Sequence, residues 1–242
     1  MNAVTRSEIP ELGGQVLLAI DTAIGTSVAL AADGAVVELA SEDPRGHAEV
    51  IGGLLAGVFA EAGVDPSRVT GVVAGIGPGP FTGLRVGIAA AHAFTVGRGV
   101  PLLPVQGHEA VALAVLESGA LAGARVLQDA RRRELFVTDY AGLDWAGVPV
   151  RVAGPGLIAR ADHVETPNDV WPERIPASGL ARLAARRLQA GIPFDDDRAL
   201  YLRAPDVKQP GAPKRVVAPA TPAAAPARAS AAARPAPGTE PA

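Results

Sequence analysis

The sequence of 242 residues contains no cysteine, only two lysines and no long hydrophobic run. Without cysteine, thiolate nucleophiles, disulfides and cysteine-ligated metals are excluded. Without an apolar run of roughly 18–20 residues, a membrane-spanning helix and a membrane partner are not expected. Residues 1–14 mix charges and lack the apolar core of a secretory signal, so we expect a cytoplasmic protein.

Several catalytic and nucleotide-binding motifs are also missing. The four histidines form no His-x-x-x-His or His-Glu-x-x-His pair, which disfavours a metal site and metal-dependent hydrolysis. No serine lies in a Gly-x-Ser-x-Gly elbow. The glycine-rich stretch 75–87 is not a Walker loop, because Leu84 follows Gly83, and it does not match Gly-x-Gly-x-x-Gly. These absences disfavour a metal-dependent hydrolase, a serine hydrolase with that elbow and a protein with either standard nucleotide-binding loop.

Charge gives a further restriction. The formal net charge is −3 at pH 7, which disfavours nucleic-acid binding by the folded body as a whole but leaves a local basic patch open. The run Arg131-Arg132-Arg133 has two interpretations, a solvated strand edge or a contact with an acidic partner.

Apolar patterning in the first half predicts strands and helices in the order βββαβα, then βα. The expected strands are 16–20, 28–31, 35–39, 72–76 and 102–105, and the expected helices are 46–62, 82–96 and 108–117. Asp33-Gly34 is a two-residue hairpin signal between the second and third strands. Gly63, Gly97 and Gly99 are helix-stop signals, and Thr82 is placed to cap its helix.

The second half predicts a shorter copy of the same pattern. The strand expected at 125–131 includes Asp129, much as the first strand leads into Asp21. Strands at 134–140 and 149–152, a helix at 181–188 and a last strand or extended segment at 199–203 would follow. The predicted organisation is an N-terminal extension (1–15), a first lobe (16–108), a second lobe (109–209) and a disordered Pro/Ala-rich tail (210–242).

Two features of the sequence are candidate phosphate-binding sites. Asp21-Thr22 is either a degenerate phosphate site or a carboxylate that caps the turn after its strand. The glycine-proline loop is either a phosphate cradle or a rigid corner, and Pro78 and Pro80 favour the corner because they lack a backbone N–H. The residues assigned to this structural motif are Gly77, Pro78, Gly79, Phe81, Thr82, Gly83 and Arg85.

Small residues mark one face of the helix predicted at 46–62. Glycine lowers the stability of a helix. A face rich in small residues therefore either allows another helix to approach closely or reflects the high Ala and Gly content of the whole sequence. Both interpretations stay open at this point. The face consists of Gly52, Gly53, Ala56, Gly57 and Ala60.

Several segments together carry a resemblance to a known family. They are Ala19-Ile20-Asp21-Thr22-Ala23, Ser27-Val28-Ala29-Leu30, His47, Gly77-Pro78-Gly79-Pro80-Phe81-Thr82-Gly83-Leu84-Arg85-Val86-Gly87, Asp129-Ala130-Arg131 and Tyr201-Leu202-Arg203. In this order they closely resemble the bacterial TsaB family (tRNA threonylcarbamoyladenosine biosynthesis protein B) over about residues 15–209. The Pro/Ala tail lies outside the resemblance.

The resemblance implies an α/β fold of the actin/hexokinase-like ATPase type, in two duplicated lobes of which the second is reduced. It also implies that the chain is a non-catalytic relative of TsaD, the catalytic subunit. TsaD uses a His-x-x-x-His metal site, which this sequence lacks. TsaB-like proteins hold TsaD in an active complex that the small ATPase TsaE also binds. That complex transfers threonylcarbamoyl to N6 of the adenosine 3′ to the anticodon in certain tRNAs.

On this resemblance the chain is a required scaffold subunit that binds no cofactor alone and leaves ATP and metal to its partners. The expected partners are TsaD, TsaE, tRNA indirectly, and a second copy when the chain is alone. TsaB-like proteins pair through their first two long helices, which implies an interface at Gly53, Leu54, Ala56, Gly57, Ala60, Gly87, Ala90 and Ala91. The alternative is an independent ATPase or kinase of the same fold.

Overall fold

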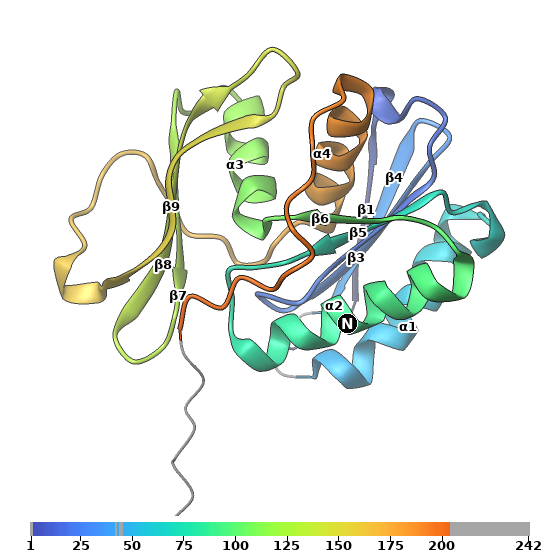
Figure 1. Cartoon of the computed structure of the whole chain (residues 1–242), viewed down its shortest axis with the longest axis horizontal. Coiled ribbons are helices and arrows are strands. Elements are labelled where there is room, and N and C mark those ends of the chain that lie inside the picture. Colours follow the sequence, from blue (N-terminus) through green and yellow to red (C-terminus); the bar gives the residue numbers. More distant parts are fainter. Residues whose placement is uncertain (1, 42, 44–45, 204–242) are drawn as a thin grey trace, which may run out of the picture. The chain divides into compact units, whose positions relative to one another are not determined.

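The computed structural model describes residues 2–41, 43 and 46–203 (Figure 1). The tail predicted at 210–242 lies outside the described residues. No helix in the described part of the chain is both long and apolar enough to span a membrane.

The first sheet has six strands in the order β1-β4-β3-β2-β5-β6. Its strands are β1 (Asn2–Glu8), β2 (Leu17–Asp21), β3 (Thr26–Ala32), β4 (Ala35–Ser41), β5 (Gly71–Gly75) and β6 (Leu102–Val105). Strands β2, β3 and β4 form the antiparallel meander that the sequence predicts, and β5 runs parallel to both β2 and β6. At the predicted hairpin, Asp33 and Gly34 have positive φ values of 52° and 79°.

Strand β1 corrects the prediction of a loose extension over residues 1–15. It pairs antiparallel with β4 along its whole length, from Asn2 opposite Ser41 to Glu8 opposite Ala35. Little in its own composition marks it as a strand, since its exposed side chains are mostly polar. The otherwise unpaired edge of β4 supplies the hydrogen-bonding partner, and a distant pairing of this kind leaves no local signal. A short helical turn, η1 (Pro10–Leu12), follows.

The second sheet repeats part of the topology of the first. Its order is β10-β7-β8-β9, with bounds β7 (Ala124–Asp129), β8 (Glu134–Leu143), β9 (Pro149–Ala159) and β10 (Asp169–Val170). As in the first sheet, an antiparallel meander is followed by a strand that runs parallel to the first strand of that meander. The hairpin β8–β9 is longer than predicted, and β10 was missed because two residues carry no periodicity.

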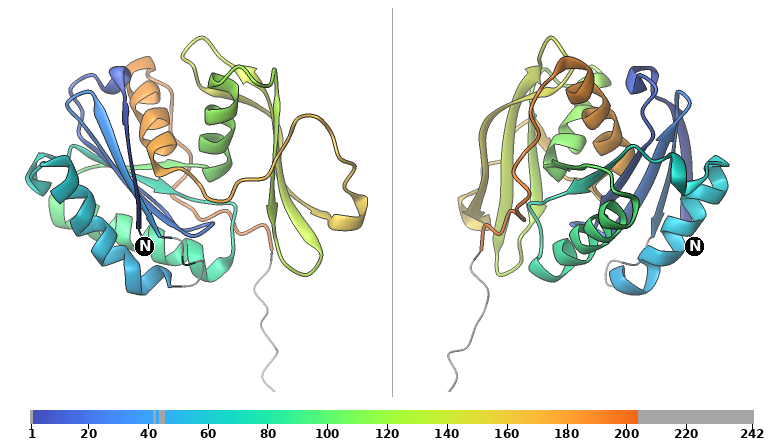
Figure 2. Two further views of the ribbon diagram at one scale, coloured as in Figure 1. Left: turned by 180° about the vertical axis from the view of Figure 1, so that it is seen from behind. Right: turned by 45° about the vertical axis from the view of Figure 1, so that its right-hand side comes forward.

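Within the described residues, four α-helices flank the first sheet or lie between the two sheets. Helices α1 (His47–Ala62) and α2 (Phe81–Arg98) cover one face of the first sheet, whereas α3 (Gly107–Glu117) and α4 (Ala177–Ala190) lie between the sheets (Figure 2). Helices α1 and α3 confirm the prediction to within one residue. Helix α2 runs through Gly97 and stops at Gly99, which has a φ of 65°.

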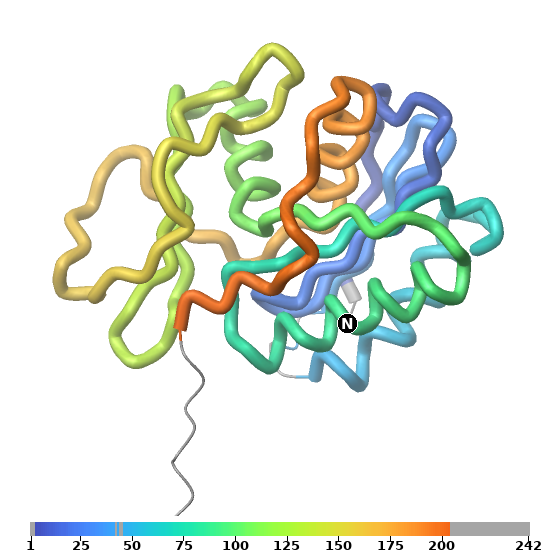
Figure 3. Tube along the Cα trace, in the orientation of Figure 1, coloured from blue at the N-terminus to red at the C-terminus, as the bar shows by residue number. Residues whose placement is uncertain are grey.

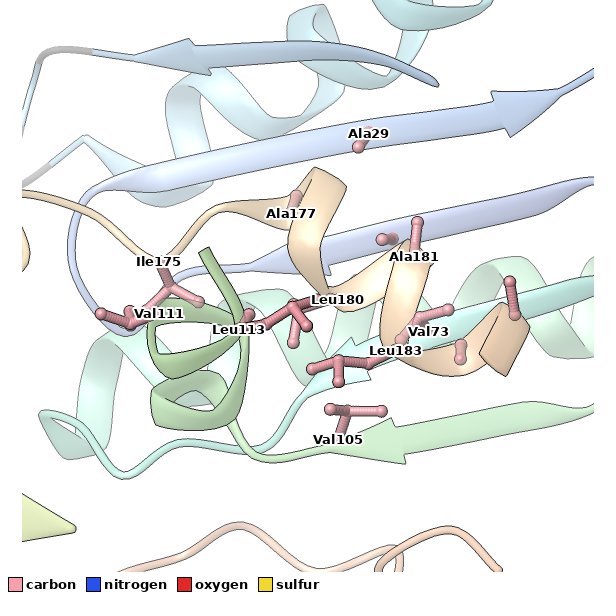
Figure 4. Packing of buried hydrophobic residues seen from close by; sticks show 14 of the residues in the cluster. Ala29, Val73, Val105, Val111, Leu113, Ile175, Ala177, Leu180, Ala181 and Leu183 are labelled. Atoms are coloured by element: carbon pink, nitrogen blue, oxygen red, sulfur yellow. The ribbon is translucent and has the colours of Figure 1, made fainter. Parts of the chain in front are cut away.

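Helix α4 completes the core of the first sheet. Leu180, Ala181 and Leu183 of α4 lie over Val73 of β5 and Val105 of β6 (Figure 4). These α4 residues fall within the second lobe predicted over 109–209. The structure instead packs α4 on strands that precede residue 108, so the main core is built from both halves of the chain.

After α4 the chain crosses back over the molecule as an extended strap (residues 191–203; Figure 3). Near its start, the Asp195 N–H donates to the carbonyl of Pro104 at 3.2 Å. Further on, the Leu200 N–H donates to the carbonyl of Ile76 at 2.9 Å. The segment predicted at 199–203 is therefore extended, and none of its residues is assigned to a strand.

Candidate functional site

The glycine-proline loop connects β5 to α2 as a tightly packed corner. Gly77 has a φ of 102°, which favours glycine, and its carbonyl accepts a hydrogen bond from the Gly107 N–H at 2.8 Å. A Cβ atom at Gly79 would come within 2.9 Å of the Ala23 side chain. Pro80, not Thr82, precedes the first helical residue, and no side chain caps this helix. The prediction that Thr82 caps α2 is therefore wrong.

An aromatic contact joins this corner to the strap. The rings of Phe81 and Tyr201 lie 4.7 Å apart, and the Arg85 guanidinium lies 3.7 Å from the centre of the Phe81 ring. Arg85 also donates through Nε to the Tyr201 hydroxyl at 3.2 Å. The motif residues Phe81 and Arg85 thus hold Tyr201 of the strap against the start of α2.

Thr22 docks the end of β2 onto α2. Its hydroxyl donates to the Gly83 carbonyl at 2.6 Å and accepts from the Gly87 N–H at 2.9 Å. A Cβ atom at Gly87 would approach the Thr22 Oγ1 to 2.4 Å, so no larger residue fits there without movement. Gly87 belongs to the partner interface that the family resemblance implies, but its small size serves this internal contact.

Asp21 is closed off from solvent beside Thr22. Its side chain accepts through Oδ1 from the Ala23 N–H at 2.7 Å, and Oδ2 has no hydrogen-bond partner. A Cβ atom at Gly75 would lie 1.9 Å from that Oδ2, so the glycine leaves room for the carboxyl group. Burial raises the pKa of Asp21 to about 7. These contacts fit the capping interpretation better than an open phosphate site.

A cleft of about 460 Å³ lies between the ends of β2 and β7. On the side of the first sheet it is lined by Ala23, Ile24, Gly25, His47, Pro80, Thr82 and Gly83, and on the other side by Leu127, Gln128, Asp129, Arg131, Trp171 and Pro172. His47 is held through Nδ1 against the Thr26 hydroxyl at 2.8 Å. Among the described residues, no three or more His, Cys, Asp or Glu side chains are grouped to hold a metal ion.

His108 is a structural residue between the two sheets. It is fully buried and contacts Thr138 through Nδ1 at 2.8 Å and Gln128 through Nε2 at 3.1 Å. Burial lowers its pKa to about 4, which keeps the ring neutral. Gln128 in turn donates to the Ala23 carbonyl at 3.3 Å, which links the second sheet to the end of β2. No local sequence pattern indicates this link between residues 105 positions apart.

The predicted interface residues of α1 and α2 divide into two groups. Gly53, Ala56 and Ala60 are exposed, and nothing lies within 4 Å of a Cβ atom built at Gly53. The remaining residues turn toward the chain's own interior: Leu54, Gly87 and Ala91 are buried, whereas Gly57 and Ala90 are half-buried.

Helix α2, which packs against α1, also exposes small residues. Together Gly52, Gly53, Ala56, Ala60, Ala89, Ala93 and Val96 form what we call the small-residue face. Val96 is 82% exposed, a high value for a branched apolar side chain. The two helices contact each other beneath this face, where the Phe59 and Phe94 rings stack at 5.8 Å.

Comparison with known proteins places the sequence in a family. Residues 21–184 match the family model described as TsaD: tRNA N6-adenosine threonylcarbamoyltransferase. An uncharacterised protein of Mycobacterium tuberculosis is 31% identical over 208 residues, which covers 79% of this chain and 93% of the relative. The tRNA threonylcarbamoyladenosine biosynthesis protein TsaB of Escherichia coli is 30% identical over 125 residues, 51% of this chain and 54% of the relative.

A solved structure resembles this chain in its fold. A Pseudomonas aeruginosa protein, described as uncharacterised with similarity to the peptidase YEAZ, superposes with a TM-score of 0.67 at 25% identity. The superposition covers 78% of this chain and 100% of that one. The chain thus belongs to the tRNA N6-adenosine threonylcarbamoyltransferase (TsaD) family, of which it is a TsaB-like member.

Proposed function

We propose that this chain is a non-catalytic scaffold subunit of a tRNA N6-adenosine threonylcarbamoyl transferase, which holds and activates a catalytic TsaD subunit in the cytoplasm. The observation that carries the proposal is the small-residue face of α1 and α2, found in a TsaB-like protein. The internal use of Asp21 and Thr22, described above, supports a role in assembly rather than in chemistry.

The small-residue face has the properties of a helix-packing surface. Short side chains let a partner helix approach closely, so that many weak dispersion contacts form over a small area. The acidic residues of α1, Glu49 and Glu61, lie close to the two ends of the helix, so the stretch between Gly52 and Ala60 carries no charge. We propose that the same face pairs with TsaD in the complex and with a second copy when the chain is alone, and that TsaE joins the complex.

The remaining parts of the proposal concern fold and cofactors. The shared topology of the two sheets supports an actin/hexokinase-like architecture, in which the second lobe is a duplicated and smaller copy of the first. In this proposal, ATP and the catalytic metal belong to the partner subunits, and this chain contacts them only through the assembly.

Replacing Gly53 with leucine tests the small-residue face. We expect Gly53→Leu to weaken pairing with TsaD by about 1–3 kcal/mol, because the added side chain overpacks a close helix contact. Leucine has a higher helix propensity than glycine, so α1 itself should not be weakened. Isothermal titration calorimetry with purified TsaD measures the change. Ala114→Leu, at an exposed position of α3, is the matched control and should bind as the unmodified chain does.

Reconstitution tests the function itself. The chain alone should not modify tRNA, and adding it to TsaD and TsaE should restore threonylcarbamoyl transfer to tRNA. Labelled threonine incorporated into tRNA is the readout. Transfer that is equally fast without this chain would rule out the scaffold role.

The cleft beside Gly83 favours a second candidate, an independent ATPase or kinase of the same fold. The enclosed carboxyl group of Asp21 counts against it. Calorimetry of the isolated chain with ATP and Mg²⁺ separates the two candidates. Submicromolar binding that is abolished by Asp21→Ala would favour the enzyme.

A further inference from the structure

The turn between β7 and β8 has an unusual backbone. Arg131, Arg132 and Arg133 have φ values of 63°, 51° and 61°, so three consecutive arginines occupy the left-handed region. Residues other than glycine rarely adopt this conformation, and it persists only where the surroundings enforce it. Such positions often lie at functional sites, which makes this turn a candidate.

Neighbouring segments brace the turn. The Ala130 N–H donates to the Glu134 carbonyl at 2.9 Å, which closes the turn. Arg203 at the end of the strap donates through Nη1 to the Ala130 carbonyl at 2.8 Å and through Nη2 to the Arg131 carbonyl at 3.2 Å. The Arg160 N–H donates to the Arg133 carbonyl at 2.7 Å. The arginine side chains are therefore presented on a fixed backbone.

The turn concentrates positive charge on a protein whose net charge is negative. All three arginines are exposed, and Arg160 lies beside them. Among the described residues, Asp129 is shared by Arg131 at 3.8 Å and Arg160 at 3.3 Å, while Glu134 pairs with Arg203. Asp162 and Glu165, both exposed, follow Arg160 by two and five residues in the sequence.

An exposed aromatic ring lies next to this charge. Trp171 is 47% exposed, and it lines the cleft together with Arg131. The Arg160 guanidinium lies 5.8 Å from the centre of its ring, and the His163 ring contacts it edge-on at 5.8 Å. The tryptophan is thus held in place while part of its surface faces solvent.

We propose that the β7–β8 turn and Trp171 bind a single-stranded segment of RNA. Arginine side chains contact backbone phosphates, and an exposed tryptophan offers a surface on which an unpaired base stacks. An acidic protein partner would use the arginines but would leave the ring without a role, which favours RNA. The inference deepens the proposed function, because it gives the tRNA substrate a direct contact with this chain.

Fluorescence anisotropy of the full chain with a labelled RNA hairpin, whose single-stranded loop is a tRNA anticodon loop, tests the proposal. The variant R131G/R132G/R133G removes the charges and keeps the left-handed turn, because glycine adopts it readily. We expect binding at least about tenfold weaker, with the slope of log affinity against log salt shallower by about 2 for three lost phosphate contacts. The control R6N/R68N/R98N removes the same charge from exposed arginines elsewhere and should bind nearly as the unmodified chain does.

Trp171 is tested separately. Trp171→Ala should weaken binding by about tenfold with little change in the salt slope, whereas Trp171→Phe should retain most of the affinity because a ring remains to stack. Binding by the unmodified chain that is absent, or that falls equally in the control, would overturn the proposal. Equal binding to a polyglutamate peptide would also overturn it and would indicate an acidic protein partner.

The reconstituted complex separates this inference from the proposed function. If the unmodified chain stimulates tRNA modification but the arginine variant binds RNA normally, the scaffold role stands and the RNA contact fails. If the chain binds RNA through the turn but never stimulates modification, the proposed function fails and the RNA contact stands.

Discussion

Arg187→Met is expected to destabilise the fold by about 3–5 kcal/mol, because it leaves carboxylates buried without their cation. Arg187 of α4 donates through Nη2 to both oxygens of Glu109 in α3, at 2.6 and 2.7 Å. Its Nη1 donates to Asp195 of the strap at 3.2 Å. Arg187 is 7% exposed and Glu109 is 4% exposed, so water cannot replace the lost partner.

The pH dependence of this loss has a definite sign. Burial raises the pKa of Glu109 even with Arg187 beside it, and removing the cation should raise it further. When a carboxyl group has a higher pKa in the folded state than in the unfolded chain, the free energy of unfolding falls as the pH rises between those two pKa values. The deficit of the variant should therefore be small in acid and grow from about pH 4.5 upward.

Urea denaturation followed by circular dichroism measures both effects. Arg182→Met is the matched control, because this arginine of the same helix pairs with Glu11 and Glu117 nearer the surface. It should cost no more than about 1 kcal/mol. The double variant Glu109→Met/Arg187→Met should recover part of the loss, since it buries one carboxylate fewer. A loss in Arg187→Met as small as in the control would contradict the buried-charge explanation.

Asp21→Asn is expected to stabilise the protein above neutral pH. The pKa of Asp21 is raised to about 7 from 3.8, first by burial and then by the charge of Glu38, and these effects outweigh the hydrogen bond from Ala23. Because the folded state binds the proton more tightly, ionisation of Asp21 lowers stability as pH rises from about 4 to about 7. The full difference corresponds to about 4 kcal/mol. Asparagine has no such ionisation and can still accept the Ala23 hydrogen bond through Oδ1.

Denaturation at a series of pH values tests this prediction. The stability of the unmodified chain, relative to Asp21→Asn, should decline between about pH 4 and pH 7 and then level off. Asp33→Asn serves as the control, because Asp33 is exposed and its Arg68 hydrogen bonds lower its pKa. The stability of the unmodified chain relative to Asp33→Asn should show no such decline, because both proteins contain Asp21. Parallel profiles for Asp21→Asn and the unmodified chain would show that Asp21 titrates normally.

Local sequence signals predicted the elements well wherever short-range chemistry decides them. Asp33-Gly34 forms the predicted hairpin with both residues at positive φ, and Gly63 and Gly99 end their helices in the left-handed conformation. Strand β6 has the predicted bounds, Leu102–Val105. In each case the determining residues are adjacent in the chain.

Features that depend on distant residues could not be predicted in the same way. The contact between Thr22 and Gly87 joins positions 65 residues apart, so the glycine looked like part of an outer face. Strand β1 depends on the edge of β4, and the left-handed arginines depend on Arg203 at the end of the strap. No local rule places arginine in that conformation. The exposed group Gly53, Ala56 and Ala60 could be predicted as a helix surface, but its partner stays a prediction.

The position of α4 also determines when the chain can fold during its synthesis. Strands β2 to β6 are complete once residue 105 has been made, yet the apolar surface that faces α4 stays uncovered until residue 190 leaves the ribosome. At roughly 5–20 residues per second, this interval lasts on the order of 4–17 seconds. A nascent chain of this length exposes Leu17, Ala29 and Val73 to other chains, so its yield should depend on chaperones that bind it in this interval.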